Sequence, residues 1–265
     1  MERAYWQRQV FEKPLFPDLL WSRPENRHHA GKLLVIGGNL HGFAAPAEAY
    51  QESLRNGVGT SRVLLPDALQ RTVGKVFEAG EYAPSTPSGS FSQKALDGFL
   101  ALSHWADGVL ITGDLGRNSE TAILLEKFAE KYTGKLTVTK DAIDYFTSTP
   151  QKVLQRVDTL FVLSLAQLQR LALSANFTQA FTFKMDLLHL VETLHHFTET
   201  FQLSLIVKHL DNVFVAHHGR ISSTKLTKDK EIWRLTAATR ATVWWLQTPN
   251  QSFEALTVSQ STLSM

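Results

Sequence analysis

The stretch of sequence that decides the fold is LLVIGGN, residues 33–39. Its four apolar residues are typical of a short buried strand, and the glycine pair at 37–38 ends that strand. A helical pattern follows over 45–55, and NGVG at 56–59 closes the helix before a second strand at 61–65. A strand, a glycine turn, a helix and another strand in this order predict one βαβ unit of a parallel sheet.

The same alternation continues along the rest of the chain. We expect further strands at 108–111, 136–139, 160–163, 205–208 and 213–216, the last of them antiparallel to its predecessor. We expect helices at 119–132, 165–173, 185–201, 231–247 and 252–263, and a short helix or turn from Asp141. Strands that alternate with helices predict an α/β fold, a three-layer α/β/α sandwich with a mostly parallel central sheet.

The segment before residue 30 breaks this pattern, because it is rich in proline, arginine and aromatic residues. We interpret it as an irregular N-terminal arm that packs on the body or on a neighbouring subunit. Its apolar side chains are Trp6, Phe11, Leu15, Phe16, Leu19, Leu20 and Trp21. The sequence therefore predicts an arm at residues 1–25, a single domain at residues 26–265, and self-association.

Composition excludes several classes of protein. Of the 265 residues, 43% are hydrophobic, which is enough for a sizeable core. The 27 Lys and Arg against 25 Asp and Glu leave a net charge of +2, which argues against a nucleic-acid binder. The absence of cysteine excludes thiol catalysis and Cys-ligated zinc. No apolar run is long enough to cross a membrane and no signal-peptide core is present, so we expect a cytoplasmic protein.

Ligands of a mostly parallel sheet bind outside the carboxyl ends of its strands. This rule selects the loops at 37–45, 112–117, 139–141, 163–167 and 208–210. The glycines at 37–38 match neither G-x-G-x-x-G nor the P-loop, so a plain tight turn is the alternative to a ligand loop. The same alternative applies to TGDLGR at 112–117.

Two other kinds of site find no support in the sequence. No G-x-S-x-G elbow for a hydrolase is present. Histidines occur in the adjacent pairs 28–29, 195–196 and 217–218. Because neighbouring residues on a helix or strand point in different directions, we expect no metal-ligating residues among them.

Several stretches have counterparts, in the same order, in one known family. NRHHAGKLLVIGGN at 26–39 is similar to H-K-G-x-x-G-x-v-L-V-I-G-G-S, and Ala44-Ala45 with LRNGVG at 54–59 stand where that family has an alanine-rich helix and R-x-G-a-G. LITGDLGR at 110–117 is similar to v-I-G-P-G-L-G-r, LTVTKDAID at 136–144 to l-V-l-D-A-D-A-L-n, and IVKH at 206–209 to v-L-K-G. From residue 26 onward the chain thus resembles the ADP/ATP-dependent NAD(P)H-hydrate dehydratases of the ribokinase-like superfamily.

The resemblance implies a ribokinase-like fold and the dehydration of hydrated NADH or NADPH, coupled to hydrolysis of ATP or ADP with Mg²⁺. It places substrate-binding positions at Gly38, Asn39, Ala45, Leu115, Gly116, Ser164 and Gln167. It places nucleotide-binding positions at Lys208, Thr239, Arg240 and Ala241, and the catalytic base position at Thr242. Relatives in this family are oligomeric, which also implies a homo-oligomer.

The groups that carry the family's chemistry are largely replaced. The family's m-A-T-a-G-t-G-D-V supplies a general base and an anion hole for the transferred phosphoryl group. LTAATRATV at 235–243 puts Thr239 and Ala241 on the two glycines and Thr242 on the aspartate. A threonine hydroxyl is no base without an activating partner, and no G-x-G-D occurs anywhere in the sequence. VLSLAQ at 162–167 replaces the family's T-P-H-x-G-E, and Thr139 replaces the first acid of its D-A-D-A.

Two hypotheses remain. The favoured one is a catalytically silent homologue that retains at most the binding of a nucleotide or a nicotinamide dinucleotide. The alternative is an active dehydratase that uses substituted residues, in which Arg240 would have to compensate for the lost anion hole. The cofactor is then ATP or ADP with Mg²⁺ if any family function is retained, and none otherwise. Neither hypothesis includes a nucleic acid or a membrane as a partner.

Overall fold

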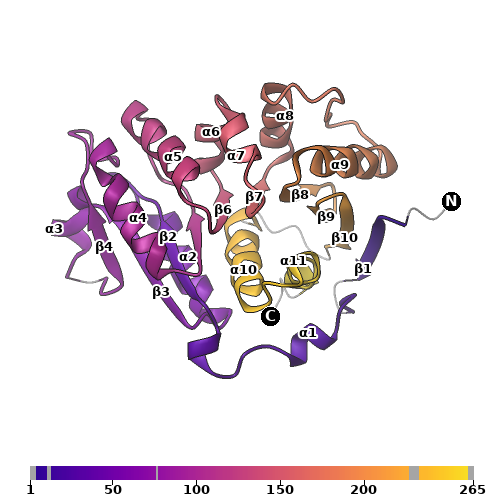
Figure 1. The fold of residues 1–265 in the computed structure, drawn as a ribbon, viewed down its shortest axis with the longest axis horizontal. Helices are drawn as coiled ribbons and strands as arrows, with labels where there is room; N and C mark the ends of the chain where they lie inside the picture. The colour runs from indigo at the N-terminus through magenta and orange to yellow at the C-terminus, as the bar shows by residue number, and fades with distance from the viewer. Residues whose placement is uncertain (1–3, 11–12, 76, 227–232, 262–265) are drawn as a thin grey trace.

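The computed structural model describes residues 4–10, 13–75, 77–226 and 233–261 (Figure 1). Its sheet has ten strands in the order β1-β10-β9-β8-β7-β6-β5-β2-β3-β4. The strands are β1 Trp6–Val10, β2 Lys32–Ile36, β3 Thr60–Pro66, β4 Gly80–Ala83, β5 Gly108–Ile111, β6 Lys135–Thr139, β7 Thr159–Leu163, β8 Ser204–His209, β9 Asn212–His217 and β10 Arg220–Lys225. From β8 across to β4 every neighbouring pair is parallel, whereas β9 is antiparallel to both β8 and β10.

Helices cover both faces of this sheet. They are α1 Asp18–Trp21, α2 Ala44–Arg55, α3 Gln70–Val73, α4 Leu96–Trp105, α5 Ser119–Lys131, α6 Ala142–Phe146, α7 Pro150–Leu154, α8 Leu165–Ser174, α9 Leu187–Phe201, α10 Trp233–Gln247 and α11 Ser252–Ser261. The expected three-layer α/β/α sandwich with a mostly parallel sheet is confirmed. The expected helices at 231–247 and 252–263 are present as α10 and α11, although positions 231–232 and 262–263 lie outside the described residues.

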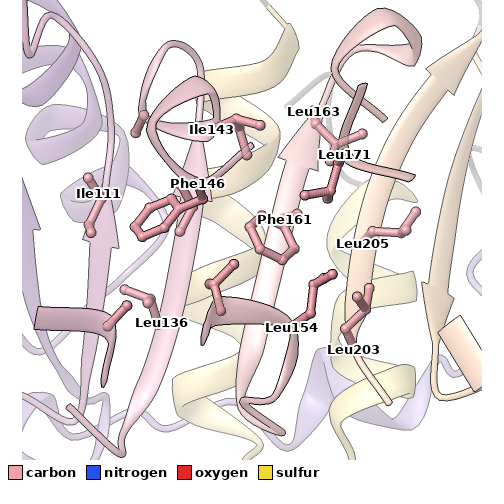
Figure 2. Packing of buried hydrophobic residues seen from close by; sticks show 14 of the residues in the cluster. Ile111, Leu136, Ile143, Phe146, Leu154, Phe161, Leu163, Leu171, Leu203 and Leu205 are labelled. Carbon is pink, nitrogen blue, oxygen red and sulfur yellow. The ribbon is translucent and has the colours of Figure 1, made fainter. Parts of the chain in front are cut away.

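The two core layers follow from the period-2 alternation of the strands. In β2, Leu34 and Ile36 belong to the cluster on the face covered by α4 to α9, whereas Leu33 and Val35 belong to the cluster under α2 and α10. Figure 2 shows part of the first layer, where Phe161 of β7 packs among apolar side chains of the neighbouring strands and helices. Because both faces are buried, the central strands are almost wholly apolar.

The edge of the sheet differs from the sequence expectation. Part of the expected irregular arm is the strand β1, which pairs in parallel with β10 in the register Trp6 to Ile221. Neither strand was expected, since β10 reads RISSTK and its buried serines and threonine carry no apolar signal. Their hydroxyls are hydrogen-bonded instead: Gln9 donates to Thr224 Oγ1 at 3.0 Å, and Ser222 Oγ lies 2.8 Å from Thr257 Oγ1.

The rest of the arm packs on the body of the same chain. Leu19 is buried against Trp244, Ala255 and Val258, while Trp21 is 88% exposed. Phe11, another expected apolar side chain of the arm, lies outside the described residues. The domain boundary after residue 25 and the self-association stay predictions. In the described part of the chain, no helix is both long and apolar enough to cross a membrane.

Candidate functional site

The loops that follow β2, β5 and β6 meet at the carboxyl edge of the sheet. The backbone N–H of Gly38 donates to the carbonyl of Gly113 at 3.0 Å, which joins the first loop to the second. The backbone of Gly38 has a φ of +87°. Residues with a side chain rarely adopt this conformation, whereas glycine adopts it freely. Gly116, the other glycine assigned to the substrate, lies in the second loop beside Asn39. The structure thus brings the predicted substrate positions Asn39 and Gly116 together.

Asp114 fills the space at the start of α2. Its Oδ2 accepts the backbone N–H of Ala45 at 2.7 Å, and its own carbonyl accepts the side-chain amide of Asn39. Asp114 has a φ of +58° and stands where the resembled family has a glycine. Aspartate tolerates this left-handed conformation better than most residues. A helix N-terminus attracts anions, so the chain's own carboxylate occupies the place that an anionic ligand would take.

Asp141 holds the same loop from the other side. Its Oδ1 accepts the N–H of Asp114 at 3.0 Å and its Oδ2 accepts the N–H of Leu115 at 3.2 Å. A Cβ atom on Gly113 would lie 2.2 Å from this carboxylate, so the close approach requires glycine there. Both oxygens of Asp141 are therefore bonded to the loop that they position.

Ser164 and Gln167 form the start of α8. Ser164 Oγ accepts the N–H of Gln167 at 3.2 Å, while Gln167 Oε1 accepts the N–H of Ser164 at 3.1 Å, which is a capping box. Gln167 also donates to the carbonyl of Lys140 at 2.7 Å and accepts from Arg234 at 2.9 Å. This side chain thus connects α8 and α10 to the loop after β6, and its polar atoms are engaged within the protein.

An open pocket of about 560 Å³ lies beside these loops. It is lined by Gly116, Arg117, Asn118, Asp141, Asp144 and Tyr145. Its size falls within the range of small-molecule sites. Burial raises the pKa of the Tyr145 phenol, so this group stays protonated at neutral pH. Arg170 pairs with Asp144 at 2.7 Å at the rim, which leaves the pocket without a strong excess of either charge.

The residues aligned with the anion hole and base lie inside α10. Thr239, Ala241 and Thr242 are at most 1% exposed, and Thr242 Oγ1 lies 2.8 Å from Thr137 Oγ1 in the middle of β6. Thr239 Oγ1 donates back to the carbonyl of Leu235. An anion hole needs backbone N–H groups without partners, as at a helix start, whereas those in a helix interior are paired with carbonyls four residues earlier.

Arg240 belongs to a buried polar cluster at the end of α2. Its Nε donates to Asn56 Oδ1 at 3.0 Å and a second guanidinium nitrogen lies 3.2 Å from Glu52 Oε1. Burial lowers the pKa of this guanidinium, and Glu52 opposes the shift. Asn56, the C-cap of α2, lies eleven positions after Ala45, which corresponds to roughly 16 Å along the helix axis. The guanidinium is thus held at the opposite end of α2 from the loops of the candidate site.

Lys208 lies near the carboxyl end of β8, at the same edge as the loops. Its neighbour His209 is buried, with Nε2 3.1 Å from the carbonyl of Met185. The sequence did not single out Asp114, Tyr145 or Arg234. Asp114 could have been identified because it replaces a glycine of the resembled family. The contacts of Tyr145 and Arg234 could not, because they depend on distant parts of the chain.

The comparisons with known proteins agree with this architecture. No family model matches the sequence. The bifunctional NAD(P)H-hydrate repair enzyme Nnr of Methanocaldococcus jannaschii is 30% identical over 131 residues. The match spans 47% of this chain and 25% of that relative, so most of the relative's length has no counterpart here.

Solved structures match over nearly the whole chain. A ribokinase-like superfamily protein from Enterococcus faecalis V583 has a TM-score of 0.71 at 14% identity and covers 99% of this chain and 88% of its own. An ADP/ATP-dependent NAD(P)H-hydrate dehydratase from Bacillus subtilis, co-crystallised with ATP and Mg²⁺, has a TM-score of 0.59 at 12% identity, with 93% and 85% covered. The fold is ribokinase-like, and the predicted resemblance to NAD(P)H-hydrate dehydratases is confirmed.

Proposed function

We propose that this chain is a divergent homologue of the NAD(P)H-hydrate dehydratases that has lost catalysis and retains at most weak binding of a nucleotide or nicotinamide dinucleotide. The observation that carries this proposal is the hydrogen bond from the Ala45 N–H to the Asp114 carboxylate. An anion that approached the start of α2 would meet a negative charge already bonded to the backbone there. The phosphates of a dinucleotide are therefore disfavoured at this position.

The state of the catalytic positions supports the same conclusion. Thr242 occupies the aligned base position, and its hydroxyl bonds to Thr137 within the core. The partners of this hydroxyl among the described residues are the Thr137 hydroxyl and the Ala238 carbonyl, neither of which is a base. A buried hydroxyl with such partners does not remove a proton from substrate or water. No G-x-G-D occurs elsewhere in the sequence to take over this role.

The carboxylates of the loops at this edge also fit Mg²⁺ poorly, and that of Asp144 in the pocket lining already pairs with Arg170. Mg²⁺ requires oxygen ligands in near-octahedral geometry and is usually bound through one or two carboxylates and the substrate's phosphates. Asp114 and Asp141 already accept N–H groups of Ala45, Asp114 and Leu115. Binding the ion there would cost these hydrogen bonds, so the proposed function includes no step through ATP and Mg²⁺.

Weak binding remains consistent with the pocket beside Arg117 and with Lys208 at the same edge of the sheet. The test is thermal unfolding of the full chain with ATP, ADP, AMP, NADH or NADPH, each with and without Mg²⁺. We expect shifts of less than about 2 °C at millimolar ligand. A ligand at one hundred times its dissociation constant adds about 2.7 kcal/mol, so a shift of several degrees at micromolar ligand would contradict the loss of tight binding.

A matched pair of variants tests whether the charge of Asp114 is the reason for weak ligand binding. Asp114→Asn keeps an oxygen that accepts the N–H of Ala45 and removes the negative charge. Glu48→Gln removes the same charge from an exposed position on α2. We expect the ligand-induced shift to grow in Asp114→Asn and to stay unchanged in Glu48→Gln. Equal shifts in both variants would mean that Asp114 does not block the site.

The active dehydratase remains the alternative function, and it requires a base other than Thr242. A cytoplasmic location and a homo-oligomeric state are further parts of the proposal. The first rests on the composition, and the second rests on the apolar arm and on the resemblance. Light scattering at micromolar concentration tests the homo-oligomeric state, because a monomer mass would contradict it.

A further inference from the structure

A cluster of potential metal ligands lies on α9, away from the pocket at the sheet's carboxyl edge. His195, His196 and Glu199 each offer one ligand atom, and these atoms all lie within 4.8 Å of one another. Helix α9 runs beside β9 and β10 near the N-terminal strand (Figure 1). Among the described residues this is the one group of three such side chains that is close enough to share an ion.

His195 is held in an orientation that suits a metal ligand. Its Nδ1 lies 2.6 Å from the carbonyl oxygen of Gly219, and since a carbonyl only accepts, the proton sits on Nδ1. The Nε2 lone pair is then left for an ion. Metal-bound histidines commonly donate their second ring N–H to a carbonyl in this way. The Tyr5 ring stacks on the imidazole at 3.9 Å with an angle of 8°, which fixes the ring plane.

The turn between β9 and β10 supplies that carbonyl. Gly219 has a φ of +83°, and a Cβ atom there would lie 3.3 Å from His195 Nδ1. The N–H of Gly219 donates to Thr198 Oγ1 on α9 at 3.1 Å. The turn is thus bonded to α9 through both the N–H and the carbonyl of Gly219, so the imidazole is positioned before any ion arrives.

Glu199 lies one turn after His195 on the same face of the helix. Its Oε2 is 3.7 Å from His195 Nε2, which is long for a hydrogen bond. With bond lengths of about 2.0–2.1 Å, two ligands of one tetrahedral zinc ion lie roughly 3.3 Å apart. The observed separation is therefore close to that of two ligands. The side chains of His196 and Glu199 are exposed and free to make the small adjustment that remains.

The sequence predicted no metal ligands among the histidines, because adjacent residues on a helix point in different directions. In the structure the rings of His195 and His196 are 5.1 Å apart at an angle of 51°, and Glu199 adds the third ligand. We propose that His195, His196 and Glu199 bind one Zn²⁺ ion, with water completing its coordination. Two imidazoles and one carboxylate suit zinc or a similar transition ion, whereas Mg²⁺ and Ca²⁺ prefer oxygen ligands. The ion would stabilise α9 at the place where the β9–β10 turn and Tyr5 pack on this helix.

The test is a zinc titration of the untagged, metal-free full chain in competition with a chromophoric chelator, without nucleotide. We expect one Zn²⁺ per chain. His196→Ala and Glu199→Gln change exposed side chains and should each weaken binding by about tenfold or more. His189→Ala removes an exposed histidine from the same helix outside the cluster and should leave the affinity unchanged. No zinc binding by the unmodified chain, or equal affinity in all three variants, would overturn the proposal.

Thermal unfolding gives a second readout that does not depend on the chelator. Zn²⁺ should raise the melting temperature of the unmodified chain and of His189→Ala, while the same concentration of Mg²⁺ should not. The zinc-induced rise should disappear in Glu199→Gln, whose melting temperature without metal should match that of the unmodified chain. An equal rise in Glu199→Gln would place the zinc elsewhere and would overturn the assignment.

Discussion

The carboxylate of Asp114 lies 2.7 Å from the backbone nitrogen of Ala45, at the carboxyl edge of the parallel strands. The loop after β5 is thereby fastened to the start of α2. The carboxylate of Asp141, just after β6, accepts two backbone N–H groups of the same loop. The carboxylates and N–H groups at this edge are therefore hydrogen-bonded to one another. The arrangement stabilises an edge that, in a working enzyme, has to leave donors open for a ligand.

Removing the Asp114 side chain should therefore destabilise the protein. Asp114→Ala deletes a hydrogen bond to a charged group and places alanine at a φ of +58°. We expect a loss of about 2 kcal/mol in the free energy of unfolding, measured by urea denaturation. Asp114→Asn should cost less than half of that, because asparagine tolerates the backbone and keeps the acceptor. An Asp114→Ala variant as stable as Asp114→Asn would contradict this description of the loop.

The Arg240 cluster makes a prediction about stability rather than about nucleotide binding. Arg240→Ala leaves the carboxylate of Glu52, a residue only 8% exposed, without its buried cation, although the neutral amide of Asn56 still donates to it at 2.8 Å. We expect a loss of about 3–5 kcal/mol in the free energy of unfolding. Arg55→Ala is the matched control, since Arg55 pairs with the same carboxylate at 3.6 Å through a side chain that is 75% exposed. That control should change stability by less than about 0.5 kcal/mol.

Restoring the family's motif within α10 should not restore catalysis. The triple variant Thr239→Gly, Ala241→Gly, Thr242→Asp puts two glycines into a helix interior, at up to about 1 kcal/mol each. It also buries a carboxylate beside Thr137. We expect a loss of more than about 3 kcal/mol and no dehydration of hydrated NADH. Thr242→Val, which removes only the hydroxyl, should cost about 1 kcal/mol. A gain of turnover in a stable triple variant would instead support the alignment of these residues.

Acid should destabilise the protein through His217. Burial lowers the pKa of this imidazole to about 3, with smaller contributions from His218, Arg220 and Lys135. The folded state keeps it neutral, bonded to Ser204 at 2.7 Å, whereas the unfolded state binds a proton below its ordinary pKa of 6.5. Its contribution is thus fully present above pH 6.5 and is lost progressively as the pH falls toward 3.

At pH 5 this one group accounts for a loss of about 2 kcal/mol relative to pH 7. The measurement is urea denaturation at the two pH values, on the unmodified chain and on His217→Gln. Because glutamine does not titrate, the loss between the two pH values should shrink by about this amount in the variant. An identical pH dependence in both proteins would show that His217 is not the group responsible.

The central strands were predictable from sequence because their burial on both faces leaves uninterrupted apolar runs, as at LLVI in β2. The outer edge was not predictable, because β10 is built from serine and threonine whose burial depends on Gln9 and Thr257, far away in the chain. The candidate site behaves in the same way. Glycine turns identified its loops, but the bond between Asp114 and Ala45 joins one of these loops to the first turn of α2, 69 positions earlier in the chain.

The position of Arg240 shows where the sequence reasoning could not decide. From the sequence, a cationic residue between Thr239 and Ala241 was compatible with a phosphate site. Its partners Glu52 and Asn56 lie almost two hundred positions earlier in the chain and carry no local signal of the contact. Only the packing of α10 against α2 shows that this arginine neutralises a buried carboxylate.

The most direct test of the proposed loss of catalysis is the conversion of hydrated NADH to NADH by the full chain in the presence of ATP and Mg²⁺. The recovery of NADH absorbance is followed beside an enzyme-free reaction and beside Asp114→Asn. Both proteins should give no rate above the enzyme-free reaction, since neither has a catalytic base at position 242. Turnover by the unmodified chain within the ordinary enzymatic range of about 1–10³ per second would contradict the account.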